Sequence, residues 1–269
     1  MELFLLPPGK RECDPIGRAL PVTEALVNEE MNGTLELTVR LPLSLAAQRD
    51  LTPQPGQVIC AACPDPRGKK DAPARLQPFR VKSVKRQSGR PVTLETEHLY
   101  FDALRQQAPA PFEWENEPLS QVCAALSLLS GCIRYRAEID TRVSGCFEDS
   151  AAAIAEALCE KYHLQLVRDG TEALLRPRED RKRGFTLSET QVTEYRLEDT
   201  LDELGQMHTS AEAVLPLGRG PCCHVFDTVT FLNRVLMVNR TLYDPVRECT
   251  RALWLGEPQP RLNGNAFTG

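Results

Sequence analysis

The fold of this chain is decided by a hairpin signal in residues 29–40, which read EEMNGTLELTVR. Asn32-Gly33 supplies backbone conformations with positive φ at low cost, so the pair is typical of a tight turn. Leucine and valine then alternate with polar residues from position 35 to position 39, which places the apolar side chains on one face of a strand. The stretch predicts an antiparallel strand over 34–40 with one buried face.

Similar signals predict a first β block over residues 1–108. A second hairpin is expected from strands at 79–85 and 91–97 with a Ser88-Gly89 turn, and a further strand is expected near 57–60. Residues 64–73 are polar and interrupted by prolines, which predicts an exposed loop. The Pro109-Ala110-Pro111 run predicts the boundary of the block.

The hydrophobic period changes in residues 109–178, which predicts a small α/β domain. Apolar residues recur every three or four positions from Leu119 to Leu129, with Asn116 as the expected cap and Gly131 as the stop. Asp149-Ser150 predicts the start of a second helix over 151–162. A strand at 132–139 and a hairpin at 164–175, turning at Asp169-Gly170, complete the domain.

Strand patterns return in residues 179–269, which predicts a second β block. Val225, Asp227, Val229 and Phe231 fall on one face of an expected strand, and a longer run from Leu236 to Tyr243 ends at Asp244-Pro245. A last strand is expected over 251–256, before a tail rich in proline, glycine and asparagine. One alternative is that the last strands pack back on the first block.

Composition excludes several classes of function. The formal net charge is −5, and the only basic cluster, at 178–183, is interrupted by Glu179 and Asp180, so sequence-specific nucleic-acid binding is not expected. The apolar start at Met1–Leu6 stops at Pro7-Pro8, and no run approaches the ~20 residues that cross a bilayer. We therefore expect no signal peptide and no stable membrane insertion.

The ten cysteines are spread through the chain, which favours reduced and mostly buried thiols over a disulfide framework. Cys60 and Cys63 nevertheless have the two-residue spacing of a metal-binding pair, and Cys222 and Cys223 could complete a four-ligand site. One such pair without a second matching pair is a weak signal. No metal or cofactor is therefore expected, and these four cysteines are the candidates if one is bound.

The sequence contains no convincing catalytic constellation. His98, His163 and His208 lack the spacings of a zinc protease or of a nucleophile elbow, so each is expected on the surface or in the core with its hydrogen bonds satisfied. The acidic run at 194–203 could hold carboxylates for glycan cleavage, but it is more typical of a solvated face.

Several segments together resemble one known family. The hairpin strands at 32–40 and 79–84 are followed downstream by Leu215-Pro216-Leu217-Gly218 at the end of a short strand, by Tyr243-Asp244-Pro245 and by a terminal strand at 253–257. In this order the segments resemble phage tail-tip and baseplate hub proteins, in particular the N-terminal hub module of the tail endopeptidases or tail-associated lysins of prophages. Each motif alone is ordinary turn chemistry, and their collinear order carries the resemblance.

The resemblance implies a β-rich α+β fold with two barrel-like tube domains and a small inserted α/β domain. It further implies a homotrimeric ring in the virion tail that closes the tail tube and adapts six-fold to three-fold symmetry. The implied partners are the tail tube or a distal tail protein, the tape-measure protein, and spike or receptor-binding components. By position in the family, the candidate interface residues are Asn32, Gly33, Leu35, Leu37, Phe79, Val81, Tyr243 and Asp244.

No enzymatic activity is expected, because the hydrolase of such proteins is a further C-terminal domain and this chain ends at Gly269. Two alternatives stay open from the sequence. One is a cell-wall peptidase that uses a cysteine, and the other is a binding module stapled by a cysteine-bound metal.

Overall fold

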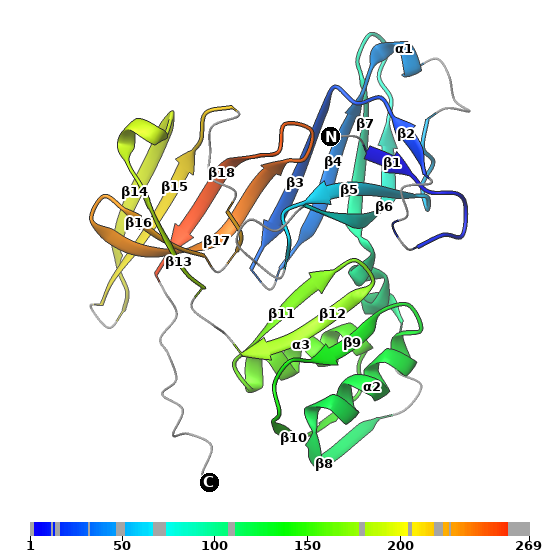
Figure 1. Cartoon of the computed structure of the whole chain (residues 1–269), viewed down its shortest axis with the longest axis vertical. Coiled ribbons are helices and arrows are strands. Elements are labelled where there is room, and N and C mark those ends of the chain that lie inside the picture. Colours follow the sequence, from blue (N-terminus) through cyan, green and yellow to red (C-terminus); the bar gives the residue numbers. More distant parts are fainter. Residues whose placement is uncertain are drawn as a thin grey trace.

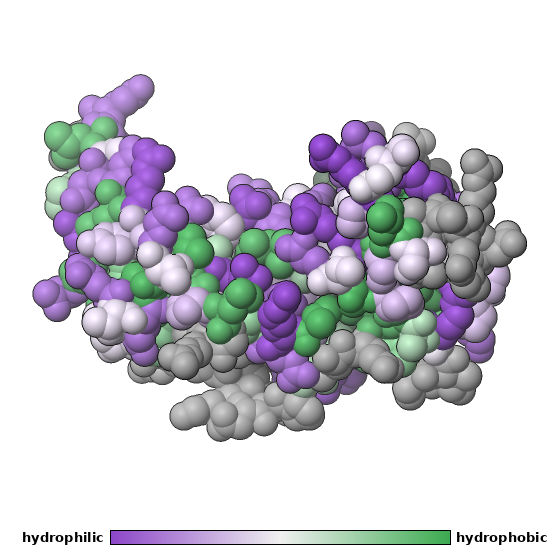
Figure 2. Space-filling view, turned by 90° about the horizontal axis from the view of Figure 1, so that it is seen from above, coloured by the Kyte–Doolittle hydropathy of each residue, from purple (hydrophilic) through white to green (hydrophobic). Residues whose placement is uncertain are grey.

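The computed structural model describes residues 3–11, 13, 17–31, 33–46, 52–66, 74–106, 111–177, 181–203, 206–217, 223–225 and 227–257. Figure 1 shows two β blocks side by side, with an α/β unit below the first of them. One face of the molecule is hollowed between two raised ends (Figure 2). The fold is β-rich α+β, which confirms the predicted fold class.

The first block is an antiparallel sheet. Among the described residues its strand order is β2-β1-β5-β6-β7-β4-β3. The strands are β1 (Leu3–Leu5), β2 (Arg18–Leu20), β3 (Glu24–Glu30), β4 (Leu35–Leu41), β5 (Val58–Cys63), β6 (Arg75–Lys85) and β7 (Val92–His98). A short helix, α1 (Leu43–Ala46), follows β4, and a 3-10 helix, η2 (Leu99–Arg105), follows β7. The alternating pattern of the sequence appears directly in β4, whose odd-numbered side chains are buried.

The second block curves around a core of its own. Its strands are β13 (Arg181–Leu187), β14 (Glu194–Leu201), β15 (Met207–Val214), β16 (Asp227–Phe231), β17 (Arg234–Asp244) and β18 (Cys249–Gly256), with a 3-10 helix, η3 (Glu189–Gln191), before β14. In the described residues they pair in the order β13-β16-β17-β18-β15-β14, and β13 is parallel to β16. Tyr195 on β14, which is half exposed, meets buried Phe231 on β16 edge to face, with ring centroids 5.4 Å apart, so side chains from strands that do not pair touch at the border of this core.

Strand β17 joins the two blocks into one sheet. Its first residues pair with β16, from Arg234 to Met237, and its later residues pair with β3, from Arg240 to Tyr243. Its opposite edge pairs with β18 over most of its length. The described strands of both blocks therefore form a single 13-stranded sheet.

The α/β unit consists of two small sheets and two helices. Its elements are β8 (Phe112–Pro118), α2 (Leu119–Ser130), β9 (Arg134–Ala137), β10 (Arg142–Phe147), α3 (Ala151–Lys161), β11 (Leu164–Asp169) and β12 (Glu172–Pro177). Strand β8 pairs with β10, and β12 lies between β11 and β9. No helix among the described residues combines the length and the apolar run that a membrane crossing requires.

The predicted helix signals are mostly confirmed. Gly131 has a φ of 59° and ends α2, and the Ser150 hydroxyl accepts a hydrogen bond from the Ala153 amide at the start of α3. The prediction of Asn116 as a cap is wrong, because Asn116 lies inside β8 and α2 begins after Pro118. The proline fixes the entry into the helix without a side-chain hydrogen bond.

The α/β unit shares a continuous core with the first block. The cluster of buried apolar side chains extends from Leu3 on β1 to Leu175 on β12 and also includes Tyr243 on β17. The second block has a separate cluster. The expected domain limits of 1–108, 109–178 and 179–269 follow these changes of secondary structure and stay predictions.

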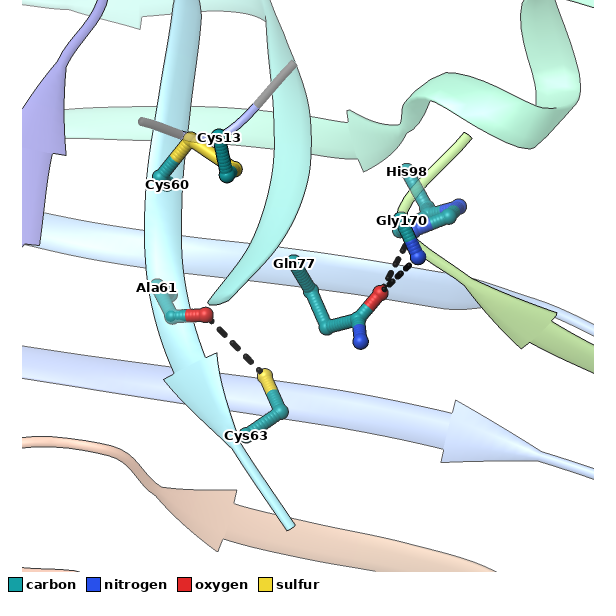
Figure 3. The surroundings of a disulfide bond; sticks show 7 residues. All are labelled: Cys13, Cys60, Ala61, Cys63, Gln77, His98 and Gly170. Atoms are coloured by element: carbon teal, nitrogen blue, oxygen red, sulfur yellow. Dashed lines mark hydrogen bonds between the residues drawn. A yellow bond between two sulfur atoms is a disulfide. The ribbon is translucent and has the colours of Figure 1, made fainter. Parts of the chain in front are cut away.

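A disulfide corrects the expectation of reduced thiols. Cys13 and Cys60 are bonded, which ties the segment after β1 to strand β5 (Figure 3). The prediction is wrong for these two residues because a pairing between positions 47 residues apart depends on the tertiary fold. Several other cysteines, such as Cys123 and Cys159, are buried as the sequence predicted.

We predict that Cys13→Ser destabilises the chain. A crosslink across 47 residues restricts the unfolded chain, and its loss is expected to lower the free energy of unfolding by about 2–4 kcal/mol. Urea unfolding with and without reductant measures the effect, and reductant should not lower the stability of the variant further. Cys146→Ser is the control because Cys146 is exposed and outside the disulfide. Equal stability of Cys13→Ser and the wild type would contradict the prediction.

Candidate functional site

The seam between the two blocks carries a polar cluster on one face of the shared sheet. Arg240 on β17 donates from Nε to Oδ1 of Asn28 on β3 at 2.7 Å, and the same nitrogen lies 3.6 Å from a carboxylate oxygen of Glu30. Its guanidinium carbon lies 4.4 Å from the ring centroid of Trp254 on β18. One side chain thus links three neighbouring strands, which stiffens the seam.

Most predicted interface residues are buried in the core. Leu37 and Phe79 are fully buried, and the exposed fractions of Leu35, Val81 and Tyr243 do not exceed 6%. The prediction that these side chains contact a partner does not fit their burial. In an alternating strand the apolar positions face the core, and a partner reaches the alternate positions, such as exposed Glu36 and Arg40.

The remaining predicted interface residues are Asn32, Gly33 and Asp244. Gly33 is half-buried, and Asn32 lies outside the described residues. Asp244 is fully buried, and its Oδ1 accepts hydrogen bonds from the amides of Val246 and Arg247 at 3.0 Å each. Its Oδ2 lies 2.7 Å from Nη1 of Arg247. Asp244 therefore shapes the turn after β17, and its side chain is not available to a partner.

Strand β14 forms one border of the shared sheet and is almost entirely exposed. All eight of its residues pair with β15, and no further strand pairs with it among the described residues. The opposite border is β2, with three residues. An exposed strand edge can take up a strand from another chain through main-chain hydrogen bonds. The acidic run at 194–203 therefore forms the border strand and the residues that follow it. Their exposure agrees with the prediction of a solvated face.

Two ion-pair clusters hold the β14–β15 hairpin in place. Arg234 on β17 donates to Asp199 on β14, with an Nη2–Oδ2 distance of 2.8 Å. His208 on β15 lies between two carboxylates, with Nε2 at 3.1 Å from Asp202 and Nδ1 at 3.1 Å from Glu257. Hydrogen bonds that His208 donates to the carboxylates of Asp202 and Glu257 raise the pKa of His208. The hairpin is thus fastened to β17 and to the residue that follows β18.

A buried hydrogen-bond network joins the α/β unit to the first block. The Gln77 side-chain oxygen accepts the Gly170 amide at 2.7 Å and lies 3.2 Å from His98 Nε2 (Figure 3). The Gln77 amide nitrogen donates to Asp169 Oδ1 at 3.4 Å. Asp169 also pairs with Arg75 at 2.6 Å. The turn between β11 and β12 is therefore anchored on strand β6.

His98 is a satisfied core residue, as the sequence predicted. Its Nδ1 accepts the Tyr100 amide at 3.2 Å, so Nε2 carries the proton and donates to Gln77. Burial lowers the pKa of His98 to about 3, with a smaller contribution from Arg168. The ring is therefore neutral at ordinary pH, and its role is to support the junction between the two units.

Arg168 extends this junction into the core. Its guanidinium carbon lies 4.9 Å from the ring centroids of both Tyr100 and Phe101 on η2. Its Nη2 lies 4.0 Å from a carboxylate oxygen of Glu156 on α3. The guanidinium group of Arg168 contacts both rings, and these contacts stabilise its charge although the side chain is buried. A neutral side chain of the same length would not make the same interactions. Sequence reasoning missed Gln77 and Asp169 as partners because they lie 92 residues apart in the chain.

The proposed cysteine cluster is not assembled in the described residues. Cys60 is in the disulfide, and Cys63 lies three positions further along β5, on the opposite face of the strand. Cys223 is buried in the core of the second block, and Cys222 lies outside the described residues. Within the described ranges no three histidine, cysteine or acidic side chains are arranged to hold a metal ion.

Comparison with known proteins identifies the fold. No family model matches the sequence, and no curated protein sequence matches it. Solved structures do match over nearly the whole chain. A prophage tail protein from Listeria monocytogenes has a TM-score of 0.67 at 9% identity, with 97% of this chain and 96% of that chain covered.

Two further structures show the same fold. The 43 kDa tail protein of prophage MuSo2 from Shewanella oneidensis has a TM-score of 0.63 at 12% identity, covering 95% and 96% of the two chains. A type VI secretion system component from E. coli has a TM-score of 0.61 at 8% identity, covering 97% of this chain and 78% of that chain. The chain therefore has the fold of phage tail proteins, which confirms the resemblance at the level of the fold.

We predict that Gln77→Leu loosens the junction. The substitution removes the acceptor of the Gly170 amide and of His98 Nε2 together with one donor to Asp169, and we expect a loss of about 1–3 kcal/mol in the free energy of unfolding. Hydrogen exchange should increase most in β11 and β12. Gln87→Leu, at an exposed turn, is the matched control. Unchanged exchange at Gly170 would contradict the proposed anchoring.

We predict a pH dependence that comes from His208. Because the folded pKa is raised, the contribution of His208 to stability is fully present below its unfolded pKa of 6.5 and is lost as pH rises through the folded value. The stability difference between the wild type and His208→Gln should therefore shrink from pH 6 to about pH 8. The lowered pKa of His98 makes stability rise with pH, but it does so equally in the wild type and in the variant. The difference in stability between the two proteins therefore reports His208 alone. A pH-independent difference would contradict the prediction.

Proposed function

We propose that the chain is a structural hub of the tail tip or baseplate of a phage or of a phage-derived particle. The observation that supports this best is the fold shared over almost the entire chain with solved tail proteins. Both β blocks and the α/β unit lie within that shared fold. The proposed location is accordingly the distal part of the tail.

We propose further that three copies form a closed ring. Each chain contributes two β blocks of a continuous sheet, so three chains present six β blocks around one axis. Such a ring can match a six-fold tube on one side and a three-fold spike on the other. Contacts between unlike surfaces close into a ring when each copy is rotated from its neighbour by a whole fraction of a full turn, which is one third for a trimer.

The other parts of the chain fit partner roles in this arrangement. The α/β unit is attached to the first block through the hydrogen bonds of Gln77, so it can project from the ring toward further components. We propose the distal tail protein or tail tube, the tape-measure protein and spike or receptor-binding components as partners. The work of the chain in this proposal is geometric, and no catalytic step is assigned to it.

Counting this chain in purified tails tests the proposal. Quantitative mass spectrometry is expected to give three copies per particle, against a tube protein from the same sample as the internal standard. Electron microscopy with a label on this chain should place it at the end of the tube. Absence from purified tails, or a copy number that scales with tail length, would exclude the hub role.

A further inference from the structure

The turn between β6 and β7 forms a basic hollow on the first block. The hollow has a volume of about 600 Å³, and its lining includes Arg40, Lys85, Arg86, Arg90 and Pro91. No acidic residue lines it. The hollow is thus suited to a negatively charged occupant.

Two of the four cations in this hollow lack an acidic partner. Arg40 pairs with Glu24 at 2.7 Å, and Lys85 pairs with Glu95. Arg86 and Arg90 are exposed and form no ion pair with any of the described residues. Two guanidinium groups are therefore available to a carboxylate, which they can bind in a bidentate manner.

The turn between β14 and β15 has the complementary character. Leu201 and Met207 are partners in the hairpin register, so their side chains lie next to each other, and they are 73% and 61% exposed. Glu203 lies beside them, is exposed, and makes no ion pair within the described part of the chain. The hairpin end therefore combines an apolar pair with a negative charge.

These two surfaces lie at opposite ends of the molecule. In Figure 1 the β6–β7 turn lies at the top right, and the last residues of β14 and the first residues of β15 lie at the left. They cannot meet within one chain. Because they differ in charge and shape, a contact between them joins two copies through unlike surfaces.

We infer that the basic hollow at the β6–β7 turn binds the β14–β15 turn of a second copy of this chain. The arginines Arg86 and Arg90 would bind Glu203, while Leu201 and Met207 lose contact with water against Pro91 and the aliphatic stems of the basic side chains. The inference rests on the proposed ring for the arrangement of copies, and it names the surfaces that form the contact between neighbours.

Charge reversal tests this contact in the full chain. One variant carries Arg86→Glu and Arg90→Glu, a second carries Glu203→Arg, and a third combines all three changes. Sedimentation velocity at about 0.05 M and about 0.5 M salt measures self-association, since exposed charges are screened at the higher ionic strength. Arg134→Glu with Arg136→Glu, on the exposed edge strand of the α/β unit, is the matched control.

We expect each charge reversal alone to weaken self-association and the combined variant to restore it. Each of the first two variants should associate at least about 10-fold more weakly than the wild type at low salt, and the combined variant should recover most of the loss. The control should associate like the wild type. Should a reversed variant fail to fold by circular dichroism, Arg86→Gln with Arg90→Gln replaces it and should show a smaller loss in the same direction.

Two outcomes overturn the inference. One is a wild type that stays monomeric at low salt, and the other is a combined variant that associates no better than either parent. These outcomes are separable from failure of the hub role. Three copies at the tail tip together with undisturbed association of the charge-reversed variants would overturn the contact and leave the hub role standing.

Discussion

Strand β17 is the element on which the architecture depends, because its hydrogen bonds hold two β blocks in one sheet. One edge of the strand pairs with β18, and the other edge pairs first with β16 and then with β3. A strand has only two edges. Strand β17 can pair with both blocks because it is 11 residues long, so that its pairing with β16 stops before its pairing with β3 begins on the same edge. The relative position of the blocks is therefore fixed by backbone hydrogen bonds, and Arg240 adds side-chain contacts across the same seam.

The α/β unit is attached by a different principle. It contributes no strand to the large sheet and instead shares a hydrophobic core with the first block. Within that core, Gln77 accepts the Gly170 amide of the β11–β12 turn and a hydrogen bond from His98, and Arg168 lies over two aromatic rings. A buried network of this kind is costly when incomplete, so it favours one orientation of the unit over its alternatives. Both kinds of attachment restrict how the units move relative to one another.

The candidate surfaces could be predicted only in part. The acidic run at 194–203 was recognisable as a solvated face because most of its residues are polar or charged, and its first eight residues form the border strand of the sheet. By contrast, Leu37, Phe79 and Val81 carried the family resemblance and were predicted as contacts, yet they are buried. The strongest sequence signals in a β protein are the alternating apolar residues, and those residues face the core. The apolar residues that carry the resemblance therefore lie mainly in the core of this chain.

The sequence by itself determined the class of fold and the order of its units, because hydrophobic period and turn residues are local properties of the chain. Gly131 and Ser150 marked helix boundaries through their own backbone or hydrogen-bonding preferences, whereas Gly33 lies between β3 and β4 without the positive φ that an Asn-Gly turn favours. Only the tertiary structure decided that Cys13 bonds to Cys60, that Gln77 meets Gly170, and that β17 pairs with β3. Each of these contacts joins residues far apart in the chain, and such pairings are set by the packing of the whole molecule and leave no local pattern to read.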